Sequence, residues 1–348
     1  MFPTSPLSRR RILGYSAATL AIASLGRHAS GTFAQDATPV PNLGWSDTFS
    51  DNGLLNVATT VAPISSIVRN IGGDRINLHG IVPDGTNSHT FEPAPSDAKI
   101  LANADVLIAN GLDLEDPTIA LAKDNMPDGA EVYTLGDKTI TPDEYAFDFS
   151  FPEDEGHPNP HLWTNVPYAM TYANLVAAEL ARLDPGNADY FAENLARYQT
   201  ALTTLDEAIR TTVESIPEAN RRLLTYHDSW AYFAPNYGMT VIGAIQPSDF
   251  SEPSPRDVAA LIDQIKAEHV PAIFGSEVFP SDVLEQIAKE AGADYVDDLR
   301  DDEPPGKPGD PDHTFIGMMK KNLQIMAAAL GGDPSLMDGV SPADTWVP

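Results

Sequence analysis

NADYFAENLARYQTALTTLDEAIRTTVE, residues 187–214, is the stretch that decides how the rest of the chain is organised. It contains neither glycine nor proline, and its apolar side chains recur every three or four positions: Leu195, Tyr198, Leu202, Leu205 and Ile209. That spacing places them on one face of a helix. At 1.5 Å per residue the helix would be about 40 Å long, which is enough to connect two lobes. A helical connection resists bending more than loose strands would.

Short strand patterns alternate with helical patterns on both sides of this segment. The expected strands before it are Leu55–Thr60, Ile76–Val82, Asp105–Asn110 and Glu131–Leu135. The expected strands after it are Arg222–Tyr226, Met239–Ile245, Ala272–Phe274 and Asp294–Val296. Such alternation predicts parallel sheets with helices on both faces. The predicted fold class is therefore α/β, with two lobes, each a mainly parallel sheet flanked by helices, joined by one long rigid helix.

The same patterns divide the chain into five parts. They are a signal peptide at 1–34, a flexible leader at 35–53, an N-terminal α/β lobe at 54–186, the linking helix at 187–214, and a C-terminal α/β lobe at 215–348. The leader is polar and contains proline and glycine, which is typical of disordered segments.

The N-terminus has the three regions of a signal peptide. Arg9, Arg10 and Arg11 precede an apolar run that ends at Leu25, and small residues continue to Ala34. The paired arginines indicate the twin-arginine export route, with cleavage near Ala34. The apolar run is short for a bilayer core of ~30 Å, although an uncleaved anchor is an alternative. We therefore expect an exported protein, periplasmic or on the extracellular face of the cytoplasmic membrane.

Charge and cysteine content limit the partners. Residues 1–34 contain four of the 21 basic residues and none of the 50 acidic ones, so the exported chain would have a net charge of −33. Such a surface repels nucleic acid and anionic lipid. The chain has no cysteine. This count rules out disulfides and a lipid-modified cysteine, and from it we predict a soluble protein that is not a lipoprotein.

Four side chains that can bind a metal ion lie where a predicted strand or helix meets a loop. His89, His227 and Asp297 each follow a predicted strand, and His161 lies just before a predicted helix. Ligands of α/β sheets bind outside the carboxyl ends of strands, so these positions favour a site. Imidazole and carboxylate ligands without thiolates suit Zn²⁺ or Mn²⁺ rather than a structural zinc module. We predict one metal site with two ligands from each lobe.

Four stretches resemble a known family: Ser88-His89-Thr90-Phe91-Glu92-Pro93, Asn159-Pro160-His161-Leu162-Trp163, His227-Asp228-Ser229-Trp230-Ala231-Tyr232-Phe233 and Gly317-Met318-Met319-Lys320-Lys321-Asn322-Leu323. From Leu54 to Leu330 the chain resembles the metal-binding solute receptors of ABC importers, which capture zinc or manganese outside the cytoplasmic membrane. The resemblance implies three histidine ligands at His89, His161 and His227. It implies a carboxylate ligand at Asp297, with Asp298 as the alternative. It also implies two α/β lobes joined by a long helix and a membrane permease as partner. We expect the receptor to act as a monomer.

The metal follows from the ligand types. Three imidazoles and one carboxylate favour Zn²⁺. Manganese prefers more oxygen, and the family's manganese receptors resemble a variant with a carboxylate in place of the third histidine. Because residue 227 is histidine, we expect Zn²⁺, with Mn²⁺ as the alternative. Ordinary imidazoles would lose the metal as the pH falls through about 6.5.

Other residues leave alternatives open. The acidic loops Thr141–Pro160 and Asp298–His313 are long enough to be functional or mobile, or they are solvated insertions. His157, in the first loop, could form a weak collecting site or simply lie in solvent. Glu277 could orient a metal ligand.

A different class of function, a zinc-dependent hydrolase, would need an open coordination position and a general base. The sequence contains no His-Glu-x-x-His motif and no Gly-x-Ser-x-Gly elbow. A receptor for a metal chelate, or an adhesin-like surface protein, is a further alternative. We therefore predict a binding protein and not an enzyme.

Overall fold

The computed structural model describes residues 49, 51–251, 253–276 and 282–348. The predicted signal peptide at 1–34, most of the predicted leader at 35–53 and Glu277 lie outside the described residues. The limits of the five predicted parts stay a prediction. Among the helices of the described part, none is both long and apolar enough to cross a membrane.

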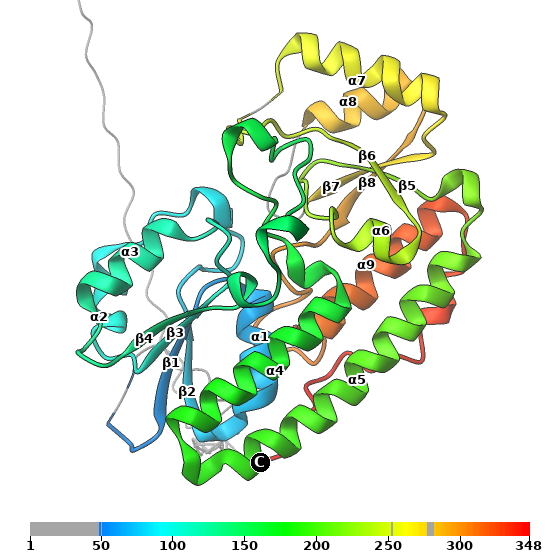
Figure 1. Ribbon diagram of the computed structural model, residues 1–348. Coiled ribbons are helices and arrows are strands. Elements are labelled where there is room, and N and C mark those ends of the chain that lie inside the picture. The colour runs from blue at the N-terminus through cyan, green and yellow to red at the C-terminus, as the bar shows by residue number, and fades with distance from the viewer. Residues whose placement is uncertain (1–48, 50, 252, 277–281) are drawn as a thin grey trace, which may run out of the picture. The chain divides into compact units, whose positions relative to one another are not determined.

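Two parallel four-stranded sheets have the same strand order. The first has the order β2-β1-β3-β4 and consists of β1 (Leu55–Thr59), β2 (Ile76–Gly80), β3 (Val106–Ala109) and β4 (Glu131–Thr134). The second has the order β6-β5-β7-β8 and consists of β5 (Arg222–Thr225), β6 (Thr240–Ala244), β7 (Ala272–Ser276) and β8 (Asp294–Leu299). The predicted α/β fold with two sheet-based lobes is confirmed (Figure 1).

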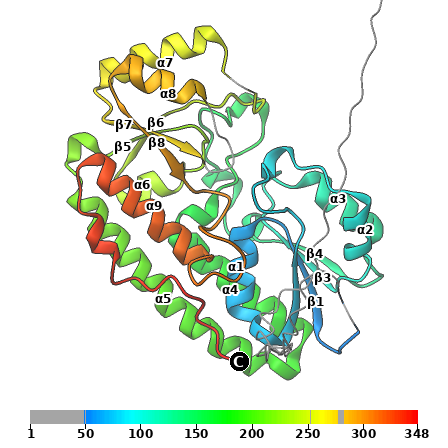
Figure 2. The same ribbon diagram turned by 180° about the vertical axis from the view of Figure 1, so that it is seen from behind.

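Helices cover both sheets. They are α1 (Ala62–Gly72), α2 (Pro95–Leu101), α3 (Asp116–Asn125), α4 (Val166–Leu183), α5 (Ala188–Ser215), α6 (Phe233–Tyr237), α7 (Pro255–Glu268), α8 (Asp282–Ala291) and α9 (Phe315–Leu330). The first sheet lies between α2 and α3 on one face and α1 and α4 on the other (Figures 1 and 2). Proline at the start of several helices, as in α1 and α7, fits the missing hydrogen bond there.

Alternate residues of the central strands point into different cores. In β1, Val57 belongs to a core that both lobes share, and Ala58 belongs to a core under α2 and α3. In β5, Leu223 belongs to the shared core and Leu224 to a core under α7 and α8. This alternation is the period of two expected of a strand that is buried on both faces. One apolar core therefore runs without interruption from lobe to lobe.

The long helix α5 is part of that shared core. Its 28 residues bury one side, which includes the predicted Tyr198, Leu202, Leu205 and Ile209. It packs against α4 and α1 of the first lobe and against α9 of the second (Figure 2). The predicted linking helix is confirmed. A wide hinge motion would have to separate these packed surfaces, so the fold favours small movements.

Loops at the carboxyl ends of the strands bring the two lobes together. In each sheet the strand order reverses beside the first strand, between β1 and β3 or between β5 and β7. In α/β folds, ligands bind at such reversal points, outside the carboxyl ends of the strands. The loops after β1, β3, β5 and β7 flank these reversal points, and the loops after β2, β6 and β8 lie at the same carboxyl ends of the sheets. A site is therefore expected among these loops.

The shared core around α5 predicts a large effect of one substitution. Leu202 is fully buried, so Leu202→Ala should lower the free energy of unfolding by about 2–5 kcal/mol, through lost burial and a residual cavity. Thr203→Ala, at the exposed neighbouring position, should change it by less than about 0.5 kcal/mol. Urea unfolding of the metal-free protein measures both. A Leu202→Ala protein as stable as Thr203→Ala would show that the core does not depend on α5.

Candidate metal centre

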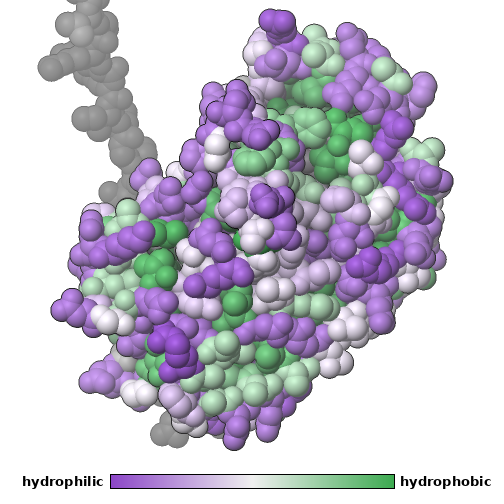
Figure 3. Space-filling model, viewed as in Figure 1, coloured by the Kyte–Doolittle hydropathy of each residue, from purple (hydrophilic) through white to green (hydrophobic). Residues whose placement is uncertain are grey.

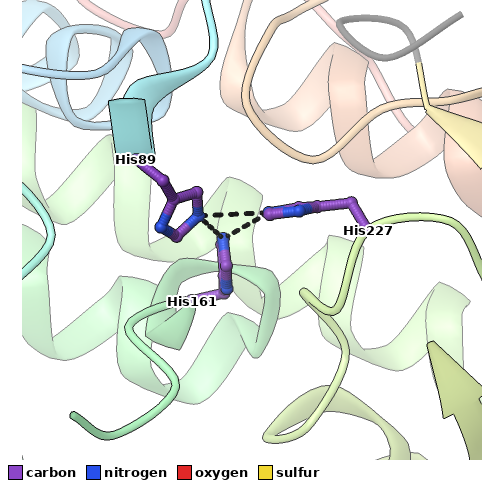
Figure 4. Close-up of side chains that lie close together, drawn as sticks. All are labelled: His89, His161 and His227. Carbon is purple, nitrogen blue, oxygen red and sulfur yellow. Dashed lines mark hydrogen bonds between the residues drawn. The ribbon is translucent and has the colours of Figure 1, made fainter. Parts of the chain in front are cut away.

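Three histidines from three separate segments meet at one point (Figure 4). The Nε2 atom of His161 lies 2.9 Å from that of His227 and 3.1 Å from that of His89, and the remaining pair is 3.2 Å apart. A tetrahedral ion bound at 2.0–2.1 Å would space its donors by about 3.3 Å. The three nitrogens are therefore already close to the spacing that a single bound ion requires.

Each histidine is held by its own loop. His89 lies in a short 3-10 turn (Ser88–Thr90) after β2, where its backbone N–H donates to Asn87 Oδ1 at 2.9 Å. His161 lies in the segment before α4, and His227 lies just after β5. The carbonyl of Pro160, next to His161, accepts a bond from Asn110 Nδ2 at 2.9 Å, and Asn110 follows β3. The predicted positions of all three histidines at the edges of elements are thus what brings them together.

Hydrogen bonds fix which ring nitrogen of His161 carries the proton. Asn159 donates its Nδ2 to the carbonyl of Asp228 at 2.7 Å, so its Oδ1 is left as an acceptor. That oxygen lies 2.8 Å from His161 Nδ1. Nδ1 must therefore carry the proton, and Nε2 presents a lone pair. His227 has an equivalent partner, because its Nδ1 lies 2.8 Å from Gln246 Oε1.

Burial and mutual proximity keep two of the rings neutral. Burial, and next to it the charge that His227 would carry, hold the pKa of His89 and of His161 well below the usual 6.5. Neutral imidazole is the form that binds a metal. A cation between the three Nε2 atoms could accept the lone pair that each neutral ring is able to present to it. The arrangement therefore suits a bound cation better than an empty site.

The structure does not bring the predicted carboxylate, Asp297, to the histidines. Asp297 is exposed and lies within β8, and it is not among the described residues that group with them. The physical reason is the length of the strand, because β8 continues to Leu299 rather than ending at Val296 as predicted. The carboxyl end of the strand therefore comes later in the chain. The side chain of the alternative, Asp298, lies outside the described part.

Asp301 is the carboxylate that lies beside the histidines. Its Oδ2 atom is 3.9 Å from His227 Nε2 and accepts a hydrogen bond from Ser229 Oγ at 2.7 Å. Its backbone carbonyl accepts a bond from Trp163 Nε1, two residues after His161, at 2.8 Å. Asp301 therefore contacts the segments that carry two of the three histidines. The rule that ligands follow strand ends could have found Asp301 if the strand end had been placed correctly.

The two residues after Asp301 contact the loop that carries the third histidine. Asp302 accepts a hydrogen bond from Ser88 Oγ at 2.7 Å, and Glu303 accepts one from the backbone N–H of Gly85 at 2.7 Å. Burial, followed by the charge of Asp301, raises the pKa of Asp302 to about 6. The segment 301–303 thus touches both lobes at the site.

Sequence reasoning also missed the residues that orient the ligands. Asn159 and Gln246 are buried amides that contact His161 and His227, respectively. Asn159 lies two residues before His161, and this short separation in the sequence is a signal for its role. His157, by contrast, is exposed, and its Nδ1 lies 2.9 Å from Asp113 Oδ2. It does not join the three histidines.

Similar proteins agree with a metal centre. A family model described as ZnuA, zinc-uptake complex component A, periplasmic, matches residues 57–329. FimA, a metal ABC transporter substrate-binding lipoprotein of Streptococcus parasanguinis, is 28% identical over 279 residues, which cover 80% of this chain and 90% of FimA. PsaA, a manganese ABC transporter substrate-binding lipoprotein of Streptococcus pneumoniae, is 27% identical over 286 residues, which cover 81% of this chain and 90% of PsaA. The structure of the periplasmic zinc binding protein TroA from Treponema pallidum matches with a TM-score of 0.73 and 28% identity, over 80% of this chain and 99% of TroA.

One prediction about location is wrong. FimA and PsaA are named as lipoproteins, which contradicts the prediction that this chain is not one. That prediction rested on the count of zero cysteines. The count excludes one covalent route to a lipid, but it does not by itself place a protein away from the membrane. The face of the molecule that Figure 3 shows is mostly hydrophilic, with smaller hydrophobic areas among the hydrophilic ones. An exported location agrees with these relatives.

The match over residues 57–329 covers most of the chain, and both sheets and α5 lie almost entirely within it. The relatives are named as substrate-binding proteins, and the solved structure is of a metal-binding protein. The chain belongs to the family of zinc-uptake complex component A, whose members are periplasmic substrate-binding proteins of metal ABC transporters and not enzymes.

Proposed function

We propose that this protein captures Zn²⁺ outside the cytoplasm and delivers it to an ABC permease in the cytoplasmic membrane. The observation that carries the proposal is the convergence of three imidazole Nε2 atoms, 2.9–3.2 Å apart, at the junction of the two lobes. Action as a monomer and export by the twin-arginine route stay predictions.

Three histidines and one carboxylate form the proposed ligand set. His89, His161 and His227 supply nitrogen, and Asp301 supplies oxygen in place of the predicted Asp297. The 3.9 Å between Asp301 Oδ2 and His227 Nε2 supports this choice, because a shift of less than about 1 Å would let both atoms bind one ion. The ligands come from both lobes, so a bound ion would join them.

The choice of zinc rests on the donor atoms. A set of three nitrogens and one oxygen is typical of Zn²⁺, whereas Mn²⁺ prefers sites with more oxygen. The names of the relatives favour neither metal, because PsaA is named for manganese and TroA for zinc. Mn²⁺ is the second candidate, and the observation that favours it is the carboxylate of Asp302, next to Asp301, as a further oxygen near the site.

Delivery would depend on small movements near the site. The shared core around α5 opposes a wide opening of the lobes. The segment 301–303 is different, because it contacts both lobes through a few hydrogen bonds. We infer that binding of the metal to Asp301 changes this segment, and that the permease distinguishes loaded from empty protein there.

Calorimetric titration of the metal-free protein tests the ligand set. We expect one tight Zn²⁺ site, bound more tightly than Mn²⁺, and a loss of at least about 100-fold in affinity in His161→Ala. Asp301→Asn should weaken binding at least about tenfold, because it removes the ligand charge. Asp297→Asn is the matched control and should bind as the wild type does.

Three results would contradict the proposed ligands or the proposed metal. Unchanged affinity in His161→Ala would remove the proposed site. Weak binding in Asp297→Asn together with normal binding in Asp301→Asn would return the carboxylate to its predicted position. Tighter binding of Mn²⁺ than of Zn²⁺ would favour the second candidate.

The lowered pKa of two ligands predicts an unusual pH dependence. An ordinary imidazole with a pKa of about 6.5 costs about threefold in metal affinity between pH 7 and pH 6, because protons compete with the metal. His89 and His161 have pKa values well below 6.5, so they remain neutral over this range and should add no such loss. Protonation of these two ligands is therefore expected at a lower pH than for ordinary histidines, and so is the loss of metal affinity that it causes.

Proton NMR of the imidazole Cε1–H signals in the metal-free protein measures these values directly. Signals are assigned by comparison with His89→Gln and His161→Gln. Exposed His157 serves as an internal comparison in the same spectra. Titration midpoints of His89 and His161 at or above 6.5 would contradict the expected neutrality.

A further inference from the structure

Two phenylalanine rings lie against the three histidines. The ring of Phe250 stacks on that of His89, with 4.6 Å between centroids and an interplanar angle of 19°. Phe151 lies 5.6 Å from His89 and 5.8 Å from His161, and the two phenyl rings are 6.0 Å apart. Neither ring can donate a ligand atom. They place apolar surface where a metal ion would enter or leave.

A cavity of about 180 Å³ meets the site on this side. Its lining includes both phenyl rings and His89, but not His161 or His227. Its polar lining includes Asp113, Glu155 and the exposed His157. An ion in this cavity would reach buried His161 and His227 past His89, and the ring of Phe250 lies stacked on His89 along that way.

The backbone of Phe250 is strained. Its φ angle is +56°, in the left-handed region that bulky side chains rarely adopt. A residue in this backbone conformation raises the free energy of the folded state by about 1–3 kcal/mol. Such residues are common at ligand clamps and switches. Phe250 N–H closes a turn by donating to the carbonyl of Pro247 at 2.9 Å. Relief of this strain would require the backbone of Phe250 to move, and such a movement would carry the ring away from His89.

Phe250 and Phe151 differ in how firmly they are held. Phe151 is buried, with 6% of its surface exposed, and follows Ser150, which donates its backbone N–H to Asp228 Oδ2 at 2.8 Å. Phe250 is only partly buried and lies in the connection between β6 and α7. Of the two phenyl rings that lie against His89, that of Phe151 is therefore the fixed one, and that of Phe250 is the one that can move.

We propose that Phe250 is the gate of the metal centre, so that its ring must leave His89 before an ion can enter or depart. The gate rests on the proposed function, because it acts on exchange of the bound metal. A gate changes the rates in both directions and leaves the equilibrium nearly unchanged, since the ring binds no metal. A ring that only positions His89 would instead change the dissociation rate and the affinity.

Stopped-flow kinetics separate these two roles. Trp163 reports on binding, because its ring lies 5.0 Å from that of His161. Phe250→Ala should raise both the association rate constant for Zn²⁺ and the dissociation rate constant in excess EDTA at least about tenfold, with Kd changed less than about threefold. Phe250→Tyr keeps a ring and should stay within about twofold of wild type. Phe149→Ala removes an exposed ring two residues from Phe151, and its rate constants should also stay within about twofold of wild type.

A second measurement needs no metal. Diethyl pyrocarbonate modifies neutral imidazoles that it can reach, and peptide mass spectrometry gives the rate at each histidine. In metal-free Phe250→Ala, modification of His89 should be at least about fivefold faster than in wild type, while the rate at exposed His157 stays the same.

The outcomes distinguish the gate from the proposed function. Normal Zn²⁺ binding with an unchanged association rate constant in Phe250→Ala would overturn the gate alone, and so would unchanged modification of His89. A wild-type protein that takes up no metal would overturn the proposed function and the gate with it. Faster rates in both directions, together with faster modification of His89, support the gate.

Discussion

The convergence of imidazole lone pairs is the constraint on which the rest of the structure depends. His161 is held with its proton on Nδ1 by an amide oxygen of Asn159, whose own orientation is set by a backbone carbonyl. Its Nε2 atom therefore points a lone pair at the Nε2 atoms of His89 and His227, about 3 Å away. Without a cation, two neighbouring nitrogens can share a proton, whereas a bound cation would accept a lone pair from all three rings. The fold thus holds the three rings near their binding positions in advance, which lowers the cost of ordering them when a divalent ion binds.

The fold can hold this arrangement because its two sheets share one core. The apolar side of α5 packs against α1, α4 and α9, so both lobes are anchored to the same helix. The loops that carry the histidines leave the carboxyl ends of strands or precede α4, and their bases are fixed by that packing. Precision at the site thus comes from rigid elements, while adjustability is left to segment 301–303 and to Phe250. This division suits a protein that must hold an ion tightly and still release it.

Much of this could be predicted from the sequence, and the reasons for the failures are specific. The alternation of short strand patterns with helical patterns and the unbroken apolar stripe of α5 indicated the fold, because both follow from local geometry. The three histidines could be found because they lie at the ends of elements. Asp297 lies exposed within β8 rather than at its end, since no local signal showed that the strand continues through two aspartates to Leu299. Gln246 and Phe250 could not be identified, because their roles depend on contacts between distant segments, whereas Asn159 lies only two residues before His161. The inference from zero cysteines to a protein that is not a lipoprotein failed because one residue count does not determine membrane association.

X-ray absorption spectroscopy of the Zn²⁺-loaded protein tests the central claim most directly. The number of imidazole ligands is read from the outer-shell scattering of the rings, and the bond lengths from the first shell. Three imidazoles at about 2.0–2.1 Å and one carboxylate oxygen are predicted. The three imidazole ligands are assigned if the spectrum loses one imidazole in each of His89→Ala, His161→Ala and His227→Ala. A spectrum with fewer than three imidazoles in the wild-type protein would contradict the account.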